Sequence, residues 1–383
     1  MRAQQSLSGL ADVQARIRAS AAEIEKTRRL PDDLVEELGR AGCYRLFAPQ
    51  WKTGKAPDYS AALLVFETLA EADGSVGWIA SQCALAQVIM GYLPRATLET
   101  VYASGPDLLA AGAFAPKGRA SRSGAGWRVT GRWPFVTGCQ FVDWLYVQCF
   151  EVENRRIALT AERLPTTRLA VFRAEDVEIL DTWNALGLRG TGSHDVQVRN
   201  RICADDWTCS LAAHDRKRDG VQAIPLVDHA GIFIAAVAVG IASGAVDDVI
   251  GVGASGKRPA FGRSRLADDA VFQCRLGEAH MQLQAARALL YTQAELVERA
   301  IEGAVLSPVD RSSLRATCNQ VMGLAVNATD TAHALARSSS VWESSPLQRR
   351  LRDIHTATQH AWNSWDFLQN LGRDLLSDAA ERT

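Results

Sequence analysis

The sequence of 383 residues lacks the marks of several common classes of protein. Its net charge is only -1, so no overall field attracts nucleic acid or an anionic membrane surface. The cysteines form no C-x-x-C pair and no His/Cys cluster at zinc spacing; they stand at positions 43, 83, 139, 149, 203, 209, 274 and 318. This scatter argues against a disulfide framework and fits a reducing cytoplasm. We expect no metal site and no nucleic-acid partner.

Long hydrophobic runs are missing as well. The longest, residues 231–244, has 14 residues and falls short of the roughly 20 needed to cross a bilayer. The first six residues lack the apolar segment of a signal peptide. We therefore expect a cytoplasmic enzyme or binding protein without membrane contact. The chain is long enough for two or three domains with a large core.

The spacing of hydrophobic residues changes twice along the chain. Residues 1–105 show helical spacing, with Asp58 as a candidate N-cap. Residues 106–210 alternate in short segments separated by Gly and Ser, which is typical of a small antiparallel sandwich or barrel. Helical spacing returns over residues 211–383, where the last helix is predicted from about 347 to 376. The sequence predicts a mainly α fold: an N-terminal helical domain, a middle β domain and a C-terminal four-helix bundle.

Two local patterns refine this prediction. Ser307-Pro308-Val-Asp310 combines an N-cap, a proline in the first turn and an acidic third position, so it predicts the start of a helix. Residues 251–256 match G-x-G-x-x-G, but an Ala/Val-rich helical segment precedes them, whereas a dinucleotide fingerprint needs a strand there. We interpret this stretch as a helix-ending loop. The order of helices, small sheet and helices also excludes a doubly wound dinucleotide fold.

Residues 131–144, Gly-Arg-Trp-Pro-Phe-Val-Thr-Gly-Cys-Gln-Phe-Val-Asp-Trp, are the most informative stretch. Trp133, Phe135 and Val136 suit a pleated surface, and Thr137 places a small hydroxyl beside Gly138, which has no side chain. Such a combination lets backbone N–H groups and one O–H approach a flat ligand closely. The simpler alternative is a core strand that ends in a turn.

Three further stretches accompany it: Trp183-Asn-Ala-Leu-Gly-Leu-Arg-Gly-Thr-Gly-Ser-His-Asp-Val196, Arg258-Pro-Ala-Phe-Gly262 and Arg352-Asp353. Together, and in this order, the four resemble the acyl-CoA dehydrogenase superfamily over essentially the whole chain. The resemblance implies a bound flavin, FMN or FAD, and a homotetramer. It implies that Phe135, Thr137 and Gly138 lie against the isoalloxazine ring.

The same resemblance implies the rest of the flavin site. Ala113, Phe114 and Pro116 would form the loop on the other side of the ring. Arg258, in an R-x-x-F-G element with Phe261, would reach the flavin phosphates of a neighbouring subunit, and its planar fork suits a phosphate. The alternatives are a simple turn at 113–116 and a solvated loop arginine at 258.

The catalytic glutamate of the dehydrogenases is missing from both of its usual places. Counting from Arg352-Asp353 puts His360-Ala361-Trp362 at the first place, and His229-Ala230 stands at the second. Ordinary acyl-CoA dehydrogenase activity is therefore not expected. The C-terminal histidines resemble instead the two-component flavin-dependent monooxygenases, which take reduced flavin from a separate reductase and use O2 to hydroxylate small organic substrates.

In that branch the position of His360 lines the site shared by flavin and substrate. An imidazole with a pKa near the working pH can orient a peroxide or accept a phenolic proton. One alternative is a dehydrogenase or oxidase that acts on a non-standard substrate with His360 or His229 as the base. Another is a member that binds flavin or an acyl group without turnover.

Candidate substrate contacts are Trp78, Gln82 and His194. Many phenol hydroxylases of the branch carry a further histidine after the G-x-G-W motif, but residues 81–87 contain none. A phenolic substrate is therefore doubtful, and the identity of the substrate stays open. Gln82 and Gln87 either bond a different group or only satisfy a helix contact. The remaining histidines are expected in helices (His280 and His333) or in an exposed charged loop (His214).

Overall fold

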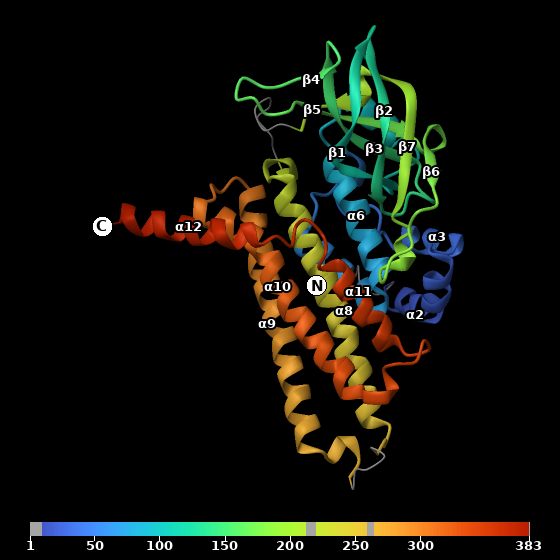
Figure 1. The fold of residues 1–383 in the computed structure, drawn as a ribbon, viewed down its shortest axis with the longest axis vertical. Coiled ribbons are helices and arrows are strands. Elements are labelled where there is room, and N and C mark those ends of the chain that lie inside the picture. The colour runs from blue at the N-terminus through green and yellow to red at the C-terminus, as the bar shows by residue number, and fades with distance from the viewer. Residues whose placement is uncertain (1–9, 212–219, 259–263, 383) are drawn as a thin grey trace.

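Helices, a β-sheet and helices again follow one another along the chain (Figure 1). The computed structural model describes residues 10–211, 220–258 and 264–382. The helices before the sheet are α2 (Leu10–Thr27), α3 (Asp32–Arg40), α4 (Gln50–Thr53), α5 (Tyr59–Ala72), α6 (Gly74–Met90) and α7 (Arg95–Val101). This arrangement of elements confirms the predicted fold class.

Helix α6 packs against strand β1 and so supports the β-sheet domain. Asp73 begins it, because its carboxylate accepts hydrogen bonds from the backbone N–H groups of Ser75 (2.9 Å) and Val76 (3.4 Å). The helix is almost uncharged and made mostly of small or apolar residues, and Gln82 is its only residue that is not buried. The predicted N-cap of α5 is also confirmed, since Asp58 accepts from the N–H of Ala61 at 2.9 Å.

The middle of the chain forms one eight-stranded sheet, in the order β6-β7-β2-β1-β3-β5-β8 with β4 paired to β3. Its strands are β1 (Ala110–Ser123), β2 (Gly126–Val136), β3 (Trp144–Glu153), β4 (Arg156–Ile157), β5 (Thr167–Arg173), β6 (Glu178–Leu180), β7 (His194–Ala204) and β8 (Thr208–Cys209).

The predicted antiparallel pairing holds for the other strand pairs but was wrong for β1 and β3, which are parallel. β1 and β2 form a hairpin, so β2 ends at the level where β1 began. Residues 137–143 then cross to the other side of β1, and β3 starts from that same end of the sheet. The end of β2 therefore lies at the edge of the sheet that faces the helices.

Trp133 fixes the end of β2. Its ring is fully buried, and its Nε1–H donates to the backbone oxygen of Gln148 at 2.7 Å. Gly118 makes room for the ring, since a Cβ there would lie 2.0 Å from its Cζ2 atom. Gly131 also makes room for the ring, since a Cβ there would lie 2.7 Å from the Cη2 atom of Trp133. The residues that follow Trp133 thus start from a rigid point.

The C-terminal part consists of α8 (Leu226–Ala254), α9 (Ala270–Ile301), α10 (Pro308–Ala336), α11 (Pro346–Ala357) and α12 (Trp365–Glu381). By length and composition α8 is apolar enough to cross a membrane, but its apolar window is entirely buried against other parts of the protein. It packs on α5, α6, α9, α10 and α11 and is a core helix. The glycine-rich stretch 251–256 spans its last turn and the turn beyond, as predicted. The capping box at Ser307 and Asp310 is also confirmed.

The single last helix predicted over about 347 to 376 was wrong. The chain breaks into α11 and α12, and residues 358–364 lie between them. Polar side chains compete for the backbone there. The amide of Asn363 donates to the backbone oxygen of Thr358 at 3.0 Å, and Ser364 accepts from the N–H of Asp366 at 3.3 Å to begin α12. His360 therefore sits in an irregular segment.

Asp353, near the end of α11, ties the helices to the sheet domain. Its carboxylate is 3% exposed and accepts a hydrogen bond from the backbone N–H of Leu188 at 2.6 Å. The neighbouring Arg352 donates to the backbone oxygen of Leu186 at 2.8 Å. Arg349 pairs with Asp73 at 3.4 Å, which adds the start of α6 to the same junction. Burial, and then the charge of Asp73, raise the pKa of Asp353 to about 7.

This junction predicts a pH dependence of stability. Because the folded protein keeps a proton on Asp353 that the unfolded chain releases, the free energy of unfolding should fall as the pH rises from about 4 to about 7, by at most about 1.4 kcal/mol per pH unit for one proton. Asp353→Asn keeps an acceptor for Leu188 and should flatten this slope in denaturant titrations. Asp33→Asn, at an exposed site, is the matched control and should keep the wild-type slope between pH 5 and 7. An unchanged slope in Asp353→Asn would contradict the assignment.

Candidate active site

The crossing segment and the loop before β7 meet at the lower edge of the sheet. The N–H of Gly138 donates to the backbone oxygen of Thr191 at 2.9 Å. The hydroxyls of Thr137 and Ser193 lie 2.9 Å apart. Phe135 has φ +62° and is 68% exposed, and its ring stands edge-on to Trp183 with 6.1 Å between centroids. The structure thus brings the first two sequence motifs together and presents Phe135 and the partly buried Thr137 outward.

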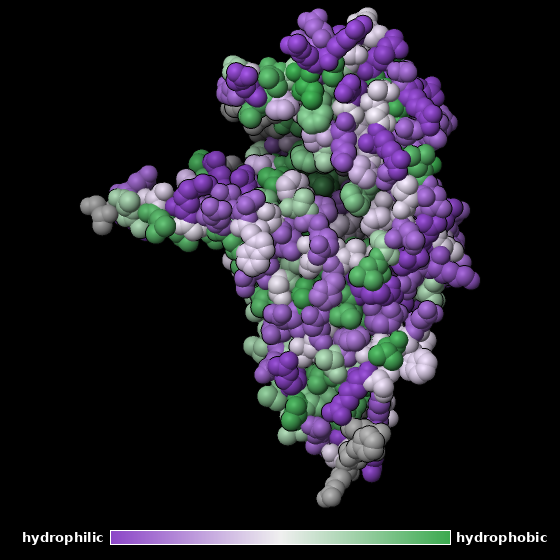
Figure 2. Space-filling model, in the orientation of Figure 1, coloured by the Kyte–Doolittle hydropathy of each residue, from purple (hydrophilic) through white to green (hydrophobic). Residues whose placement is uncertain are grey.

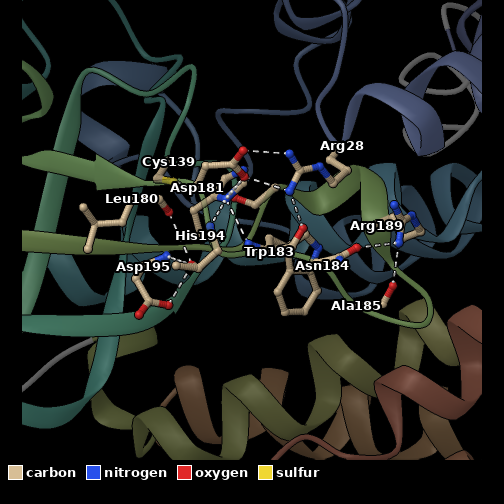
Figure 3. Close-up of polar contacts among 12 residues, drawn as sticks. Arg28, Cys139, Leu180, Asp181, Trp183, Asn184, Ala185, Arg189, His194 and Asp195 are labelled. Atoms are coloured by element: carbon tan, nitrogen blue, oxygen red, sulfur yellow. Dashed lines mark hydrogen bonds and ion pairs between the residues drawn. The ribbon is translucent and has the colours of Figure 1, made fainter.

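The loop of the second motif is held by a polar cluster around His194 (Figure 3). Nδ1 of His194 accepts hydrogen bonds from the backbone N–H groups of Thr182 and Trp183, both at 3.1 Å. Arg28, just beyond α2, donates to the backbone oxygen of Trp183 at 2.8 Å and binds Asp181 through two nitrogens. Arg28 therefore ties the chain just after α2 to this loop.

His194 does not lie at an open substrate face. It is 1% exposed, and burial lowers the pKa of its imidazole. Because Nδ1 accepts two N–H groups, the ring is neutral and the Asp181 oxygen 3.4 Å away forms no true ion pair with it. This setting makes His194 a support for the loop and departs from the predicted substrate contact.

A bulge in β1 forms a second wall. The register of β1 against β3 shifts between Ala113 and Gly118, so residues 114–117 leave the ladder. Ala113 is 7% exposed, whereas Phe114 and Pro116 are half-buried. The ring of Phe114 reaches Trp362, with 5.9 Å between centroids.

An aromatic cluster surrounds His360. Trp78 of α6 stands edge-on to the imidazole at 5.6 Å between centroids, and Trp362 lies 6.3 Å from it. Nδ1 of His360 accepts the backbone N–H of Trp362 at 3.4 Å, which leaves the ring proton on Nε2. Burial lowers the pKa of His360 to about 4. The expectation of a pKa near the working pH was wrong, because these aromatic neighbours remove the water that would stabilise the charged ring.

The other predicted contacts have different surroundings. Gln82 is half-buried on α6, and its amide lies 3.5 Å from the hydroxyl of Ser81. Gln87 is buried and bonds the N–H of Phe47 and the backbone oxygen of Tyr44, so it satisfies only helix and loop contacts.

His229 is sealed inside the helical core. Nε2 bonds the backbone oxygen of Val221 at 2.8 Å and Nδ1 the hydroxyl of Tyr59 at 3.2 Å, and its side chain is fully buried. Burial lowers its pKa to about 4. Both ring nitrogens are engaged, so the structure does not place His229 to act as a base on a substrate.

Arg258 is exposed just beyond α8, at the end of the bundle far from the sheet (Figure 1). One chain therefore does not bring it to Thr137. Phe261, the second residue predicted from this element, lies outside the described residues, as does His214.

A hollow with hydrophobic residues inside it lies between the sheet domain and the helices (Figure 2). A flavin needs a flat surface and a polar group near the edge of its ring, and the exposed ring of Phe135 and the partly buried hydroxyl of Thr137 supply them. The residues present therefore fit a flavin. Reasoning from the sequence assigned no role to Arg28, Thr191 or Ser193. Thr191 and Ser193 belong to the second motif, where their i, i+2 spacing was a signal that could have found them, whereas nothing in the sequence pointed to Arg28.

Comparison with known proteins agrees with this arrangement. Residues 11–93 match the family described as acyl-CoA dehydrogenase, N-terminal domain, and residues 232–365 match acyl-CoA dehydrogenase, C-terminal domain. An indole-3-acetate monooxygenase of Acinetobacter baumannii is 30% identical over 358 residues, which cover 93% of this chain and 90% of the relative.

Two further matches extend the comparison. The flavin-dependent monooxygenase oxygenase subunit HsaA of Rhodococcus jostii is 27% identical over 91% of each chain. The structure of XiaF from Streptomyces sp., in complex with FADH2 and glycerol, has a TM-score of 0.88 at 24% identity and covers 98% of this chain and 96% of that one. Whole-length likeness and the histidine at the place of the dehydrogenase glutamate lead to one conclusion: the chain belongs to the acyl-CoA dehydrogenase family and, within it, to the flavin-dependent monooxygenases.

Proposed function

We propose that this protein is the oxygenase component of a two-component system that hydroxylates an aromatic substrate about the size of an indole. The observation that supports this best is the neutral imidazole of His360 between Trp78 and Trp362. Reduced FMN or FAD, delivered by a separate reductase, supplies the electrons that activate O2. The protein works in the cytoplasm.

Each residue has a distinct task in this proposal. Phe135 and Gly138 would hold the flavin ring from the sheet, and Ala113, Phe114 and Pro116 would close its other side. Thr137 would bond the ring near N5.

Trp78, Phe114 and Trp362 form apolar walls that exclude water and stack on an aromatic substrate. Gln82, the one residue of α6 that is not buried, offers an amide at the rim.

In this proposal His360 orients a ligand by donating a hydrogen bond and does not remove a proton from it. With its pKa lowered to about 4, it is neutral throughout the physiological range and too weak a base to hold a proton. Its Nε2–H is a hydrogen-bond donor on a half-buried ring beside two tryptophans, where competition from water is reduced. It therefore positions oxygen or a polar group of the substrate. A phenol is not the expected substrate, because residues 81–87 lack the histidine that phenol hydroxylases carry.

The flavin site is shared between copies in a homotetramer. Arg258 lies at the far end of the bundle, so the arginine that meets the flavin phosphates comes from a neighbouring subunit. Helix α12 projects from the body like an arm (Figure 1), has no buried residue and carries hydrophobic residues along one side (Figure 2). Trp365 is 82% exposed and Leu376 is 76% exposed. Packing against another copy would bury this side of the arm.

Turnover tests the proposal directly. The purified protein, a flavin reductase, NADH and either FMN or FAD should convert indole or indole-3-acetate to a product that carries one oxygen atom from isotopically labelled O2, as detected by mass spectrometry. Resorcinol serves as the phenolic comparison and should react more slowly. If these rings instead reduce bound oxidised flavin without O2, the protein is a dehydrogenase or oxidase and the proposal fails.

Substitution of His360 tests its role as a neutral donor. His360→Phe removes one hydrogen bond in a dry site and should lower kcat/KM about 10- to 100-fold, whereas His360→Gln, with an N–H near the same place, should retain most of the rate. Both variants should bind flavin as the wild type does. His280→Phe, on the exposed face of α9, is the control. A kinetic pKa near 6.5 in the wild type that both variants lose would show that His360 titrates as a base.

The arm predicts a specific loss of assembly. Leu376→Glu places a charge on the hydrophobic side of α12 and should convert the tetramer to smaller species, as measured by size-exclusion chromatography with light scattering. Leu164→Glu, at a 63% exposed site between β4 and β5, is the matched control and should leave the mass unchanged. A Leu376→Glu variant with the mass of the wild type would exclude α12 from the contact.

A further inference from the structure

Three hydroxyl groups form a continuous line from the buried loop to the flavin side of the sheet. Thr191 Oγ1 lies 2.7 Å from the backbone oxygen of Leu188. Ser193 Oγ lies 2.8 Å from Thr191 Oγ1, and Thr137 Oγ1 lies 2.9 Å from Ser193 Oγ. Thr191 is 1% exposed and Ser193 is 5% exposed, whereas Thr137, at the outer end, is only partly buried.

The buried end of this line fixes its direction. A carbonyl oxygen only accepts, so the hydrogen of Thr191 must point to Leu188. A hydroxyl has one hydrogen, so Thr191 can only accept from Ser193, and Ser193 in turn can only accept from Thr137. The hydrogen of Thr137 is thereby used inside the protein. What Thr137 offers to a ligand is a lone pair.

The two redox states of a flavin differ at the atom that meets this lone pair. Reduced flavin carries a hydrogen on N5, whereas oxidised flavin has a lone pair there. An acceptor at Thr137 therefore bonds the reduced form and repels the oxidised form. If Thr137 were free to rotate, it could adapt to both.

We propose that Thr191 and Ser193 are positioning residues that orient Thr137 as a fixed hydrogen-bond acceptor, so that the site selects reduced over oxidised flavin. The inference rests on the proposed function, which puts flavin N5 beside Thr137. A two-component oxygenase benefits from such selection, because it must take up reduced flavin and release the oxidised form after turnover.

Substitutions at Thr191 and Ser193, away from the ligand, can change the direction of the hydrogen bonds along the line of hydroxyls. Thr191→Val removes the acceptor of Ser193, whose hydrogen can then point to Thr137 and free the hydrogen of Thr137 for the ligand. The carbonyl of Leu188 keeps two donors, the Nε1–H of Trp183 at 3.0 Å and the backbone N–H of residue 191 at 3.1 Å, so no buried acceptor is left unpaired. Ser193→Ala breaks the line one step closer to Thr137.

The test measures dissociation constants of reduced and oxidised FMN and FAD, anaerobically for the reduced forms. Wild type should bind reduced flavin more tightly. Thr191→Val and Ser193→Ala should each lower the ratio of the two affinities about fivefold to tenfold, the effect of one hydrogen bond. Thr191→Ser keeps the hydroxyl and should retain the ratio. Thr329→Val, with the same loss of a buried hydroxyl but in α10, is the matched control and should retain it too.

The outcomes separate this inference from its premise. If Thr137→Val changes the ratio but Thr191→Val and Ser193→Ala do not, Thr137 contacts N5 without being oriented and the inference is overturned. If Thr137→Val has no effect either, N5 does not lie at Thr137, and the inference falls together with that placement, while the turnover assay decides the proposed function independently. A change in melting temperature without a change in ratio would mark a purely structural role.

Discussion

Asp353 accepts a hydrogen bond from the amide of Leu188 in a place that water barely reaches, and this bond joins the C-terminal helices to the loop before β7. On one side it holds α11, which is followed by the irregular segment that carries His360. On the other it fixes Leu188, whose carbonyl starts the line of hydroxyls that ends at Thr137. A carboxyl group in such surroundings is costly to ionise, and for this reason the junction also couples the fold to pH.

Desolvation is the common cause of the chemistry proposed at the site. The aromatic rings that would hold a flat substrate also strip water from His360 and keep it neutral. The dehydrogenases of the family place a glutamate there, a group suited to removing a proton. An uncharged donor in a dry pocket suits a different task, the orientation of oxygen and substrate without competition from a proton acceptor.

The sequence was informative where the cause is local. The N-caps at Asp58 and Ser307 and the helix-ending stretch 251–256 follow from residues a few positions apart, and they were predicted correctly. The parallel pairing of β1 and β3 was missed, because strand order depends on contacts between distant segments. The break at residues 358–364 was missed because the prediction followed the helical spacing, whereas the side chains of Asn363 and Ser364 bond the backbone there.

The candidate site shows the same division between features with a local cause and features that depend on distant contacts. The motifs around Thr137 and His360 predicted the segments of the candidate site, but the pKa of His360 and the settings of His194 and His229 depend on neighbours far away in the chain. Arg28 shows the limit most clearly, because its partners Trp183 and Asp181 lie 155 and 153 residues further along the chain.

The distance between Arg258 and Thr137 within one chain has a consequence for how the protein behaves on dilution. When groups from two protein molecules bind one ligand, the free energy of ligand binding includes the free energy with which the two molecules associate. Flavin would then act as a cross-link that strengthens the assembly, and dilution would weaken both together. At low abundance in a cell the protein would hold little flavin even where flavin is plentiful, so its output would rise more steeply than in proportion to its concentration.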